Sequence, residues 1–211
     1  MGNSHPGLFC WGGSIASHVL LSLPPPQLYM LGPWINYSAV HLCLTFIFQY
    51  IPVPDPAQTN LLLFPLDGLL RANSVLQTLS LLSRPGVSPL LVQSPLFHFI
   101  LGMTASAGGG LLGGTLSLTS ETWTFSTPPP LRTGVFGLWS THDMWAGGIV
   151  AVIYGSLTSH PAFANVLSVT LSTSSARASS VAVMIAFFGA RAFATRPKKL
   201  VQPPKEKVKT Q

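Results

Sequence analysis

Charged side chains are scarce in this sequence, and their scarcity decides the class of protein. Asp, Glu, Lys and Arg make up 8% of the 211 residues, whereas an average soluble domain has about 25%. Hydrophobic residues make up 47%, and the mean hydropathy is +0.46. These values exclude an ordinary soluble domain and predict an all-α, polytopic membrane protein.

Acidic residues are the rarest charged group, with five Asp and Glu against eleven Lys and Arg. The net charge of +6 comes from the C-terminal tail, because residues 196–211 hold six of the basic residues and one of the acidic ones. The rest of the chain is nearly neutral, which argues against nucleic-acid binding. We therefore divide the chain into a membrane domain, 1–195, and a basic, disordered cytosolic tail, 196–211. Within this tail Lys198 and Lys199 are candidate ligands for lipid headgroups.

Signatures of catalysis are missing as well. The sequence has no GxSxG, HExxH or CxxC motif and no P-loop, and GGGLLGG lacks the GK[ST] ending that a nucleotide loop needs. The two cysteines, Cys10 and Cys43, lie in apolar stretches and are expected to be small buried hydrophobic residues. We predict no enzymatic activity and neither a metal nor a cofactor, apart from a bound anionic phospholipid.

Long apolar segments separated by proline-rich loops predict six transmembrane helices. Their ranges are Leu8–Leu23, Leu28–Tyr50, Asn60–Ser83, Leu96–Leu118, Leu131–Leu157 and Ala178–Ala194. The Ser/Thr-rich stretch Thr158–Arg177 is expected to be a loop with an interfacial helix. Basic flanks remain in the cytosol, so the tail places the C-terminus there, and an even number of crossings places the N-terminus there too.

Glycines are concentrated in the fourth of these segments and are expected to break its helix in the middle. The residues are Gly108, Gly109, Gly110, Gly113 and Gly114, and the first segment carries Gly12 and Gly13. One interpretation is a pore: two hinged helices expose backbone carbonyls to a hydrated path, with hydroxyls from Thr104 and Ser106. The other interpretation is close packing between helices of the small-xxx-small kind. The sequence leaves both open.

The first and fourth segments also share an order of features. Each is a glycine-containing apolar helix followed by three prolines and a segment that begins with Leu, as in PPPQLYMLGPW (Pro24–Trp34) and PPPLRTGVFGLW (Pro128–Trp139). The copies are three crossings apart, which places corresponding loops on opposite faces of the membrane. This pattern predicts inverted repeats, an architecture in which the transport path lies at the broken helices; chance similarity is the alternative.

At these residues the sequence resembles the trimeric intracellular cation channel family, known as TRIC. The matching stretches are CWGGSIASHVLLSLPPPQL (Cys10–Leu28), Tyr50–Asp55, SPLFHFILGMTASAGGGLL (Ser94–Leu112) and PPPLRTGVFG (Pro128–Gly137). The resemblance implies two inverted three-helix repeats plus a seventh helix, with this chain lacking the first. It also implies a homotrimer in the endoplasmic reticulum or nuclear envelope, whose subunits each conduct K⁺ as a counter-ion for Ca²⁺ movement.

The chain departs from this family in its third segment. Animal members carry a Lys-Glu-Val-Val-Arg motif that is associated with lipid binding and the pore, whereas this chain has Asp67-Gly68-Leu69-Leu70-Arg71 and keeps only the arginine. Asp67 and Arg71 are four residues apart and share a helical face. Because charges inside a membrane are costly and mark functional sites, we assign this pair to a pore or a lipid site. The alternative is that Pro65 breaks the helix, so that Arg71 reaches the membrane interface.

Histidines supply the remaining candidates. His142 and Asp143 are adjacent within an apolar segment and are expected to form hydrogen bonds between helices; a proton relay is the alternative. His18, His41 and His98 are expected to be core or interfacial residues, because no pair has the spacing of a metal site.

These observations together favour a K⁺ channel of an intracellular membrane. A secondary transporter, which inverted repeats suit equally well, and a non-conducting, truncated membrane scaffold are the alternatives.

Overall fold

The computed structural model describes residues 6–52, 56–117, 124–128, 131, 141–164 and 170–194. In these residues every regular element is helical, and the order is α1 (Pro6–Leu20), α2 (Gly32–Tyr50), α3 (Pro56–Ser80), α4 (Pro89–Val92), α5 (Pro95–Thr115), α7 (His142–Leu157) and α8 (Thr173–Ala194). Three short 3₁₀ turns join them: η1 (Pro26–Leu28), η2 (Leu81–Ser83) and η4 (Pro161–Phe163). The fold is therefore all-α, as the composition predicts.

Proline and serine set several helix boundaries. Pro33, Pro89 and Pro95 lie in the first turns of α2, α4 and α5, where a missing N–H costs nothing because that group has no partner within the helix. Ser94 caps α5, because its hydroxyl accepts a hydrogen bond of 3.2 Å from the N–H of Phe97. Pro24 and Pro25 follow the end of α1, so this helix has only 15 residues.

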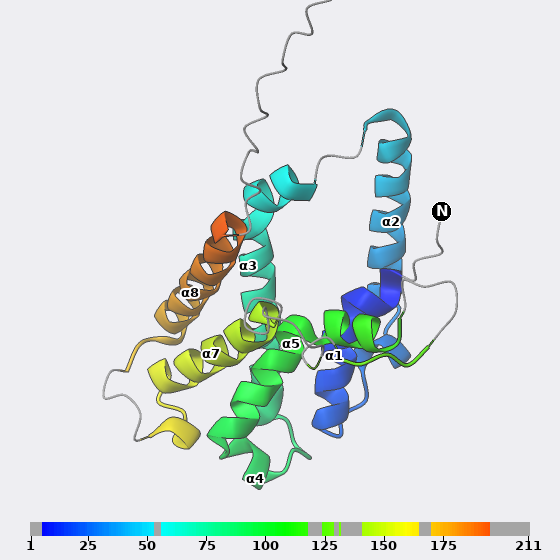
Figure 1. The fold of residues 1–211 in the computed structure, drawn as a ribbon. Helices are drawn as coiled ribbons and strands as arrows, with labels where there is room; N and C mark the ends of the chain where they lie inside the picture. The colour runs from blue at the N-terminus through cyan, green and yellow to red at the C-terminus, as the bar shows by residue number, and fades with distance from the viewer. Residues whose placement is uncertain are drawn as a thin grey trace, which may run out of the picture.

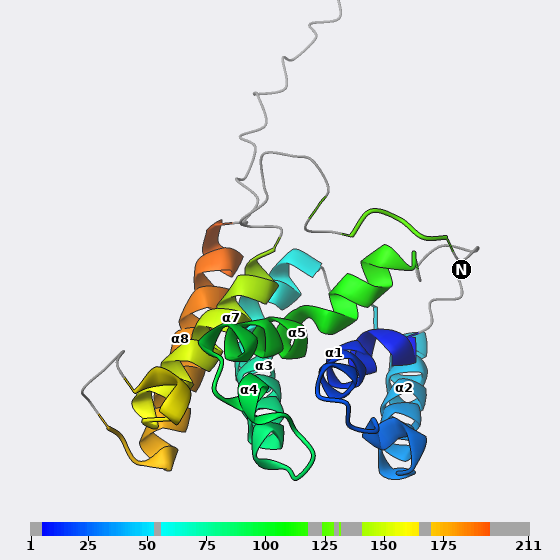
Figure 2. The same ribbon diagram turned by 90° about the horizontal axis from the view of Figure 1, so that it is seen from below.

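Helix continuity differs from expectation in several places. Pro65 lies inside α3 without ending it, which excludes the alternative that it breaks this helix. The expected break in α5 is wrong, because one helix continues through Gly108, Gly109 and Gly110. Figures 1 and 2 show that α5 bends along its length, as expected for a glycine-kinked helix. The interfacial loop is shorter than expected, because α8 begins at Thr173, five residues before the predicted span. The local preferences of proline, glycine and serine therefore do not set the helix bounds in these places.

The core lies where α5 meets its neighbours. α5 packs mainly against α7 and α1, and α3 packs mainly against α8 and α5. Fully buried side chains at these contacts include Val75, Leu101, Val150 and Met184. The helices α3, α5, α7 and α8 therefore form one packed body, which Figure 1 shows on the side away from α2.

Helix α2 stands apart from this body. It has no buried residue, and its inner contacts are ring contacts of Trp34 and Tyr37 with Trp11 of α1, at centroid distances of 4.5 Å and 5.3 Å. Large apolar side chains such as Leu42 and Phe46 are exposed along it. Cys43 is exposed on the same helix, so its expected burial is wrong.

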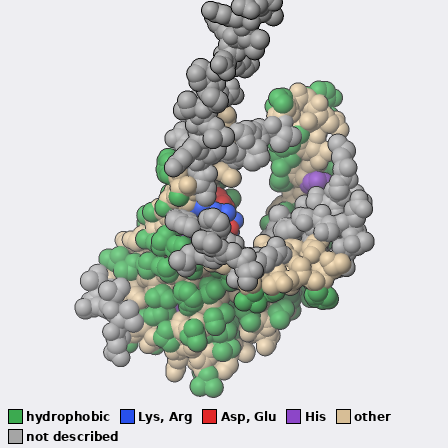
Figure 3. Space-filling view, in the orientation of Figure 1, with side chains coloured by type: hydrophobic (Ala, Val, Ile, Leu, Met, Phe, Trp, Pro, Cys, Tyr) green, Lys and Arg blue, Asp and Glu red, His purple; other side chains and the backbone are tan. Residues whose placement is uncertain are grey.

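Two of the described helices, α5 and α8, are long and apolar enough to cross a membrane. This finding, together with the apolar surface of α2, indicates association with a membrane. Figure 3 agrees, because hydrophobic side chains cover much of the visible face while charged ones gather in a single place. The second copy of the sequence repeat, Pro128–Trp139, lies largely outside the described residues, as does the whole tail with Lys198 and Lys199.

Candidate functional site

Four charged side chains meet where α3, α7 and α8 pack together, and we call them the charged quartet: Asp67 and Arg71 of α3, Asp143 of α7 and Arg191 of α8. Arg71 Nε lies 2.9 Å from Asp67 Oδ1, and Arg71 Nη1 lies 3.1 Å from Asp143 Oδ2. Arg191 donates to the other oxygen of Asp143 through its Nη1. Asp143 thus links two arginines from different helices, and the quartet carries two positive and two negative charges.

Arg71 is held inside the body by two further contacts. Its Nη1 donates to the backbone carbonyl of Ser106 on α5 at 2.7 Å, and its guanidinium lies over the ring of Phe188, 4.9 Å from the centroid. Its side chain is 28% exposed. Arg71 therefore points into the helical body. Because α3 is continuous through Pro65, this proline does not move Arg71 to the membrane interface.

The carbonyls that precede the glycines of α5 are hydrogen-bonded to α3. Ser106 O accepts from Arg71, and Ala105 O accepts from the hydroxyl of Ser74 at 3.1 Å. These two carbonyls thus bind protein donors at the positions where the pore interpretation expects water or an ion. The hydroxyl of Ser106 is buried and forms no hydrogen bond with another described residue.

A cavity of about 370 Å³ lies beside the quartet. We call it the first cavity; all four members of the quartet line it, together with Thr59, Asn60, Phe64 and Phe188. The lining residues come from α3 between Thr59 and Arg71, from the start of α7 and from the C-terminal half of α8. Asp67 is 48% exposed and uses one carboxylate oxygen in its ion pair with Arg71. The first cavity therefore brings a half-exposed carboxylate, two polar side chains and the arginines together.

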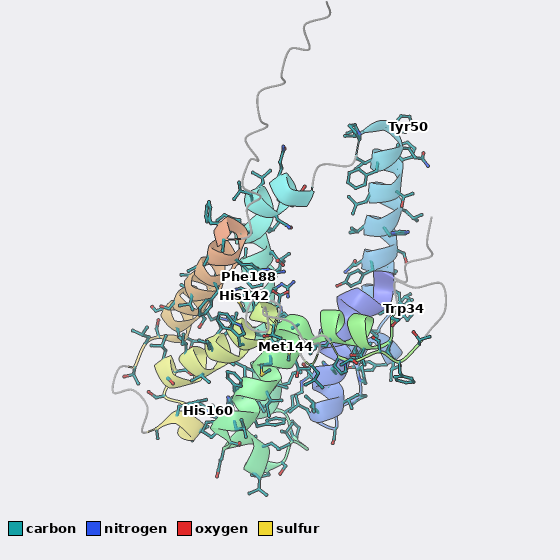
Figure 4. All side chains as sticks on the ribbon, in the orientation of Figure 1. Trp34, Tyr50, His142, Met144, His160 and Phe188 are labelled. Atoms are coloured by element: carbon teal, nitrogen blue, oxygen red, sulfur yellow. The ribbon has the colours of Figure 1, made fainter. Side chains whose placement is uncertain are left out.

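His142 and Asp143 have different surroundings. The ring of His142 is 1% exposed and lies against Trp145 and Phe188, with centroid distances of 4.8 Å and 5.2 Å. Figure 4 shows His142 next to Phe188. His142 Nδ1 is 3.6 Å from Asp143 Oδ1, too far for a good hydrogen bond. Asp143 makes the links between helices, and His142 is packed among aromatic rings.

The glycines predicted to form a pore or hinge divide into two groups. Gly12 and Gly13 of α1 pack directly on α5: an added Cβ on Gly12 would lie 2.6 Å from Cα of Gly109, and one on Gly108 would lie 2.7 Å from Cα of Gly13. Gly110, in contrast, is exposed and has no such neighbour within 4 Å among the described residues. Close helix packing, the second of the two interpretations, therefore describes Gly12, Gly13, Gly108 and Gly109.

The other histidines lie in three different environments. His98 is buried, and its Nε2 donates to the carbonyl of Val92 at 2.9 Å. His18 is buried too, with Nδ1 2.8 Å from the carbonyl of Ser14. His41 is exposed on α2, so it is not a core residue. Within the described residues, no three side chains of His, Cys, Asp or Glu come together as a metal site requires.

Sequence reasoning missed Arg191 and Phe188 as members of this site. Arg191 is an arginine inside an apolar helix, so the rule that singled out Arg71 would also have found it. Phe188 carried no such signal, because an aromatic residue in an apolar helix is ordinary. Its place over Arg71 depends on how α3 and α8 pack.

Compared with protein-family models, with curated proteins and with solved structures, the chain matches none of them.

Proposed function

We propose that this chain is the membrane domain of a monovalent-cation channel, in which K⁺ passes beside the charged quartet. One observation carries the proposal: four charged side chains of an otherwise apolar helical body face one another and a cavity. A charge inside a bilayer costs about 2.5–3.5 kcal/mol on insertion scales and commonly marks an ion path. Pairing within the quartet offsets part of this cost, and water in the first cavity offsets more.

The four side chains have different roles in this proposal. Asp67 attracts cations, because its carboxylate is half-exposed and only one of its oxygens is paired with Arg71. Arg71 fixes the shape of the path by joining α3 to α5 and α7. Asp143 holds Arg71 and Arg191 in place and keeps these two positive charges from repelling cations.

The wider arrangement is proposed on the sequence and its resemblance to TRIC. It comprises six crossings in inverted repeats, a cytosolic C-terminus, a homotrimer in the endoplasmic reticulum or nuclear envelope, and K⁺ flow that balances Ca²⁺ movement. The contact of α1 with α5 supports it, because these are the two helices that the repeat pairs. In this arrangement Lys198 and Lys199 bind anionic lipid headgroups at the cytosolic surface.

Planar-bilayer recording of the purified chain in a K⁺ gradient tests the proposal. We expect single-channel steps that reverse near the K⁺ equilibrium potential, and a lower conductance or open probability for Arg71→Ala. Unchanged conductance of Arg71→Ala would remove the quartet from the path. A wild-type chain that passes no current would favour a non-conducting scaffold.

A secondary transporter is the second candidate, and the glycine contact favours it. Close backbone contact of Gly12 and Gly13 with Gly108 and Gly109 leaves no room for water at this point between α1 and α5. A carrier needs such a closed barrier on one side of its site at a time. Liposome flux separates the two candidates, because a transporter shows saturation and coupling to a second ion whereas a channel shows neither.

A further inference from the structure

A second cavity, of about 510 Å³, lies at the opposite end of the α3–α8 pair. Its lining comes from the end of α3, from η2, from the C-terminal end of α7 and from the start of α8, and it includes His98, Tyr154, His160 and Arg177. Arg177 and Arg191 are fourteen residues apart on α8, so about 21 Å of helix separates these two arginines. Figure 4 shows His160 at the far end of α7 from His142.

The charge of this second cavity is not balanced. Arg177 lines it and forms no ion pair with another described residue, and no Asp or Glu is among the lining residues. The cavity also includes Thr173, where α8 begins. Ser172 caps this helix and accepts from the N–H of Ser175 and Ala176. The N–H groups of Thr173 and Ser174 face away from any intrahelical acceptor, as at every helix start. This end of the molecule therefore offers donors and positive potential to an anion.

His98 adds a different requirement. It lines the same cavity and is 2% exposed. Because Val92 O accepts from Nε2, the neutral ring keeps its lone pair on Nδ1. That Nδ1 is buried and has no hydrogen-bond partner among the described residues. An acceptor buried without a partner costs about 1–3 kcal/mol, and a ligand that donates an O–H or N–H would remove this cost.

We propose that the second cavity binds a phosphate ester that also carries an O–H or N–H donor. The phosphate oxygens accept from Arg177 and from the first N–H groups of α8, and the donor group binds Nδ1 of His98. His160 contributes as well, because its Nδ1 accepts from the N–H of Ala162 and its Nε2–H is therefore free to donate. A phospholipid headgroup and a soluble phosphate ester share this chemistry.

Binding of two lipids to the delipidated full chain in detergent, followed by native mass spectrometry, tests the proposal. Phosphatidylglycerol and phosphatidylethanol carry the same net charge, but only phosphatidylglycerol has hydroxyl donors. We expect the wild type to prefer phosphatidylglycerol and Arg177→Gln to bind it about tenfold more weakly or worse, since a charge-assisted hydrogen bond is lost. Arg84→Gln is the matched control, because Arg84 is exposed just after η2 and does not line the cavity.

Two further arms complete the experiment. His98→Phe should lose the preference between the two lipids, whereas His98→Gln, which keeps an acceptor, should retain it; thermal unfolding verifies that both variants are folded.

Glycerol 3-phosphate replaces the lipid in a parallel titration. Binding of this compound alone with the same dependence on Arg177 supports a soluble ester, and binding of phosphatidylglycerol alone supports a headgroup. Equal binding by wild type and Arg177→Gln, or no preference between the lipids in the wild type, would overturn the proposal.

Discussion

The two cavities at the ends of α3 and α8 differ in how their arginines are compensated. In the first cavity, Arg71 and Arg191 share Asp143, and Arg71 also pairs with Asp67. In the second cavity, no Asp or Glu is among the described residues that line the cavity with Arg177. The same two helices thus carry a neutral polar cluster at one end and an uncompensated positive charge at the other.

This difference separates two uses of arginine in an apolar helical body. An arginine in the interior needs a counter-charge, because desolvation costs several kcal/mol per ion. An arginine in the first turns of a helix can reach water or a headgroup and needs no protein partner. We therefore connect the first cavity with ion passage and the second with ligand binding, and the predictions below test this division.

Removal of Asp143 should have the largest effect on stability. Asp143→Ala leaves Arg71 and Arg191 beside each other without their shared counter-charge. Because these side chains are 27–41% exposed, we expect a loss of about 2–3 kcal/mol, below the cost of breaking a fully buried ion pair. Unfolding in detergent measures the loss, and Asp143→Asn should recover part of it by keeping hydrogen-bond acceptors. Wild-type stability of Asp143→Ala would mean that the quartet is not formed.

Displacement of α5 should have the next largest effect on stability. It should also disturb the first cavity, because Arg71 of that cavity donates to the carbonyl of Ser106 on α5. In Gly108→Ala the new Cβ would lie 2.7 Å from Cα of Gly13. Overpacking of this kind costs about 1–3 kcal/mol. Gly110→Ala is the matched control: no atom of the described residues lies within 4 Å of its added Cβ, and the substitution should stabilise the helix by up to about 1 kcal/mol. Equal stability of the two variants would contradict the close contact of α1 with α5.

A drop in pH should give the smallest loss of stability, and it should act through His160 in the second cavity. Burial lowers the pKa of His160 below its ordinary value of 6.5. The unfolded chain therefore takes up a proton before the folded chain does, so stability is full above pH 6.5 and is lost as the pH falls below it. Thermal unfolding at about pH 7.5 and about pH 5.5 measures the loss. His160→Asn keeps an acceptor for Ala162 and should show a smaller change; an identical change would exclude His160 as its cause.

The sequence was most informative where a residue type is rare. Asp67 and Arg71 stand out in an apolar segment, their spacing predicts a shared helical face, and they form an ion pair of 2.9 Å. The long apolar segments likewise predict helices, and α3, α5 and α8 lie within a few residues of their expected ranges.

The sequence was least informative about which helices pack together. Asp143 and Arg191 are 48 residues apart, and no local pattern predicts that they meet. The glycines of α5 were compatible with a pore and with close packing, and only the approach of α1 distinguishes the two at Gly108. Cys43 is expected to be buried because it lies in an apolar stretch, but it is exposed on α2 and no other described residue covers it.

Single-channel conductance of Asp67→Asn at low and high salt tests most directly whether the first cavity lies on a cation path. Charge at the mouth of a path concentrates cations only over a Debye length, which is about 30 Å at 0.01 M and about 3 Å at 1 M ionic strength. We predict that Asp67→Asn conducts less K⁺ than the wild type at low salt and that the difference shrinks at high salt. Equal conductance of the two proteins at both salt concentrations would contradict the claim that cations pass beside the charged quartet.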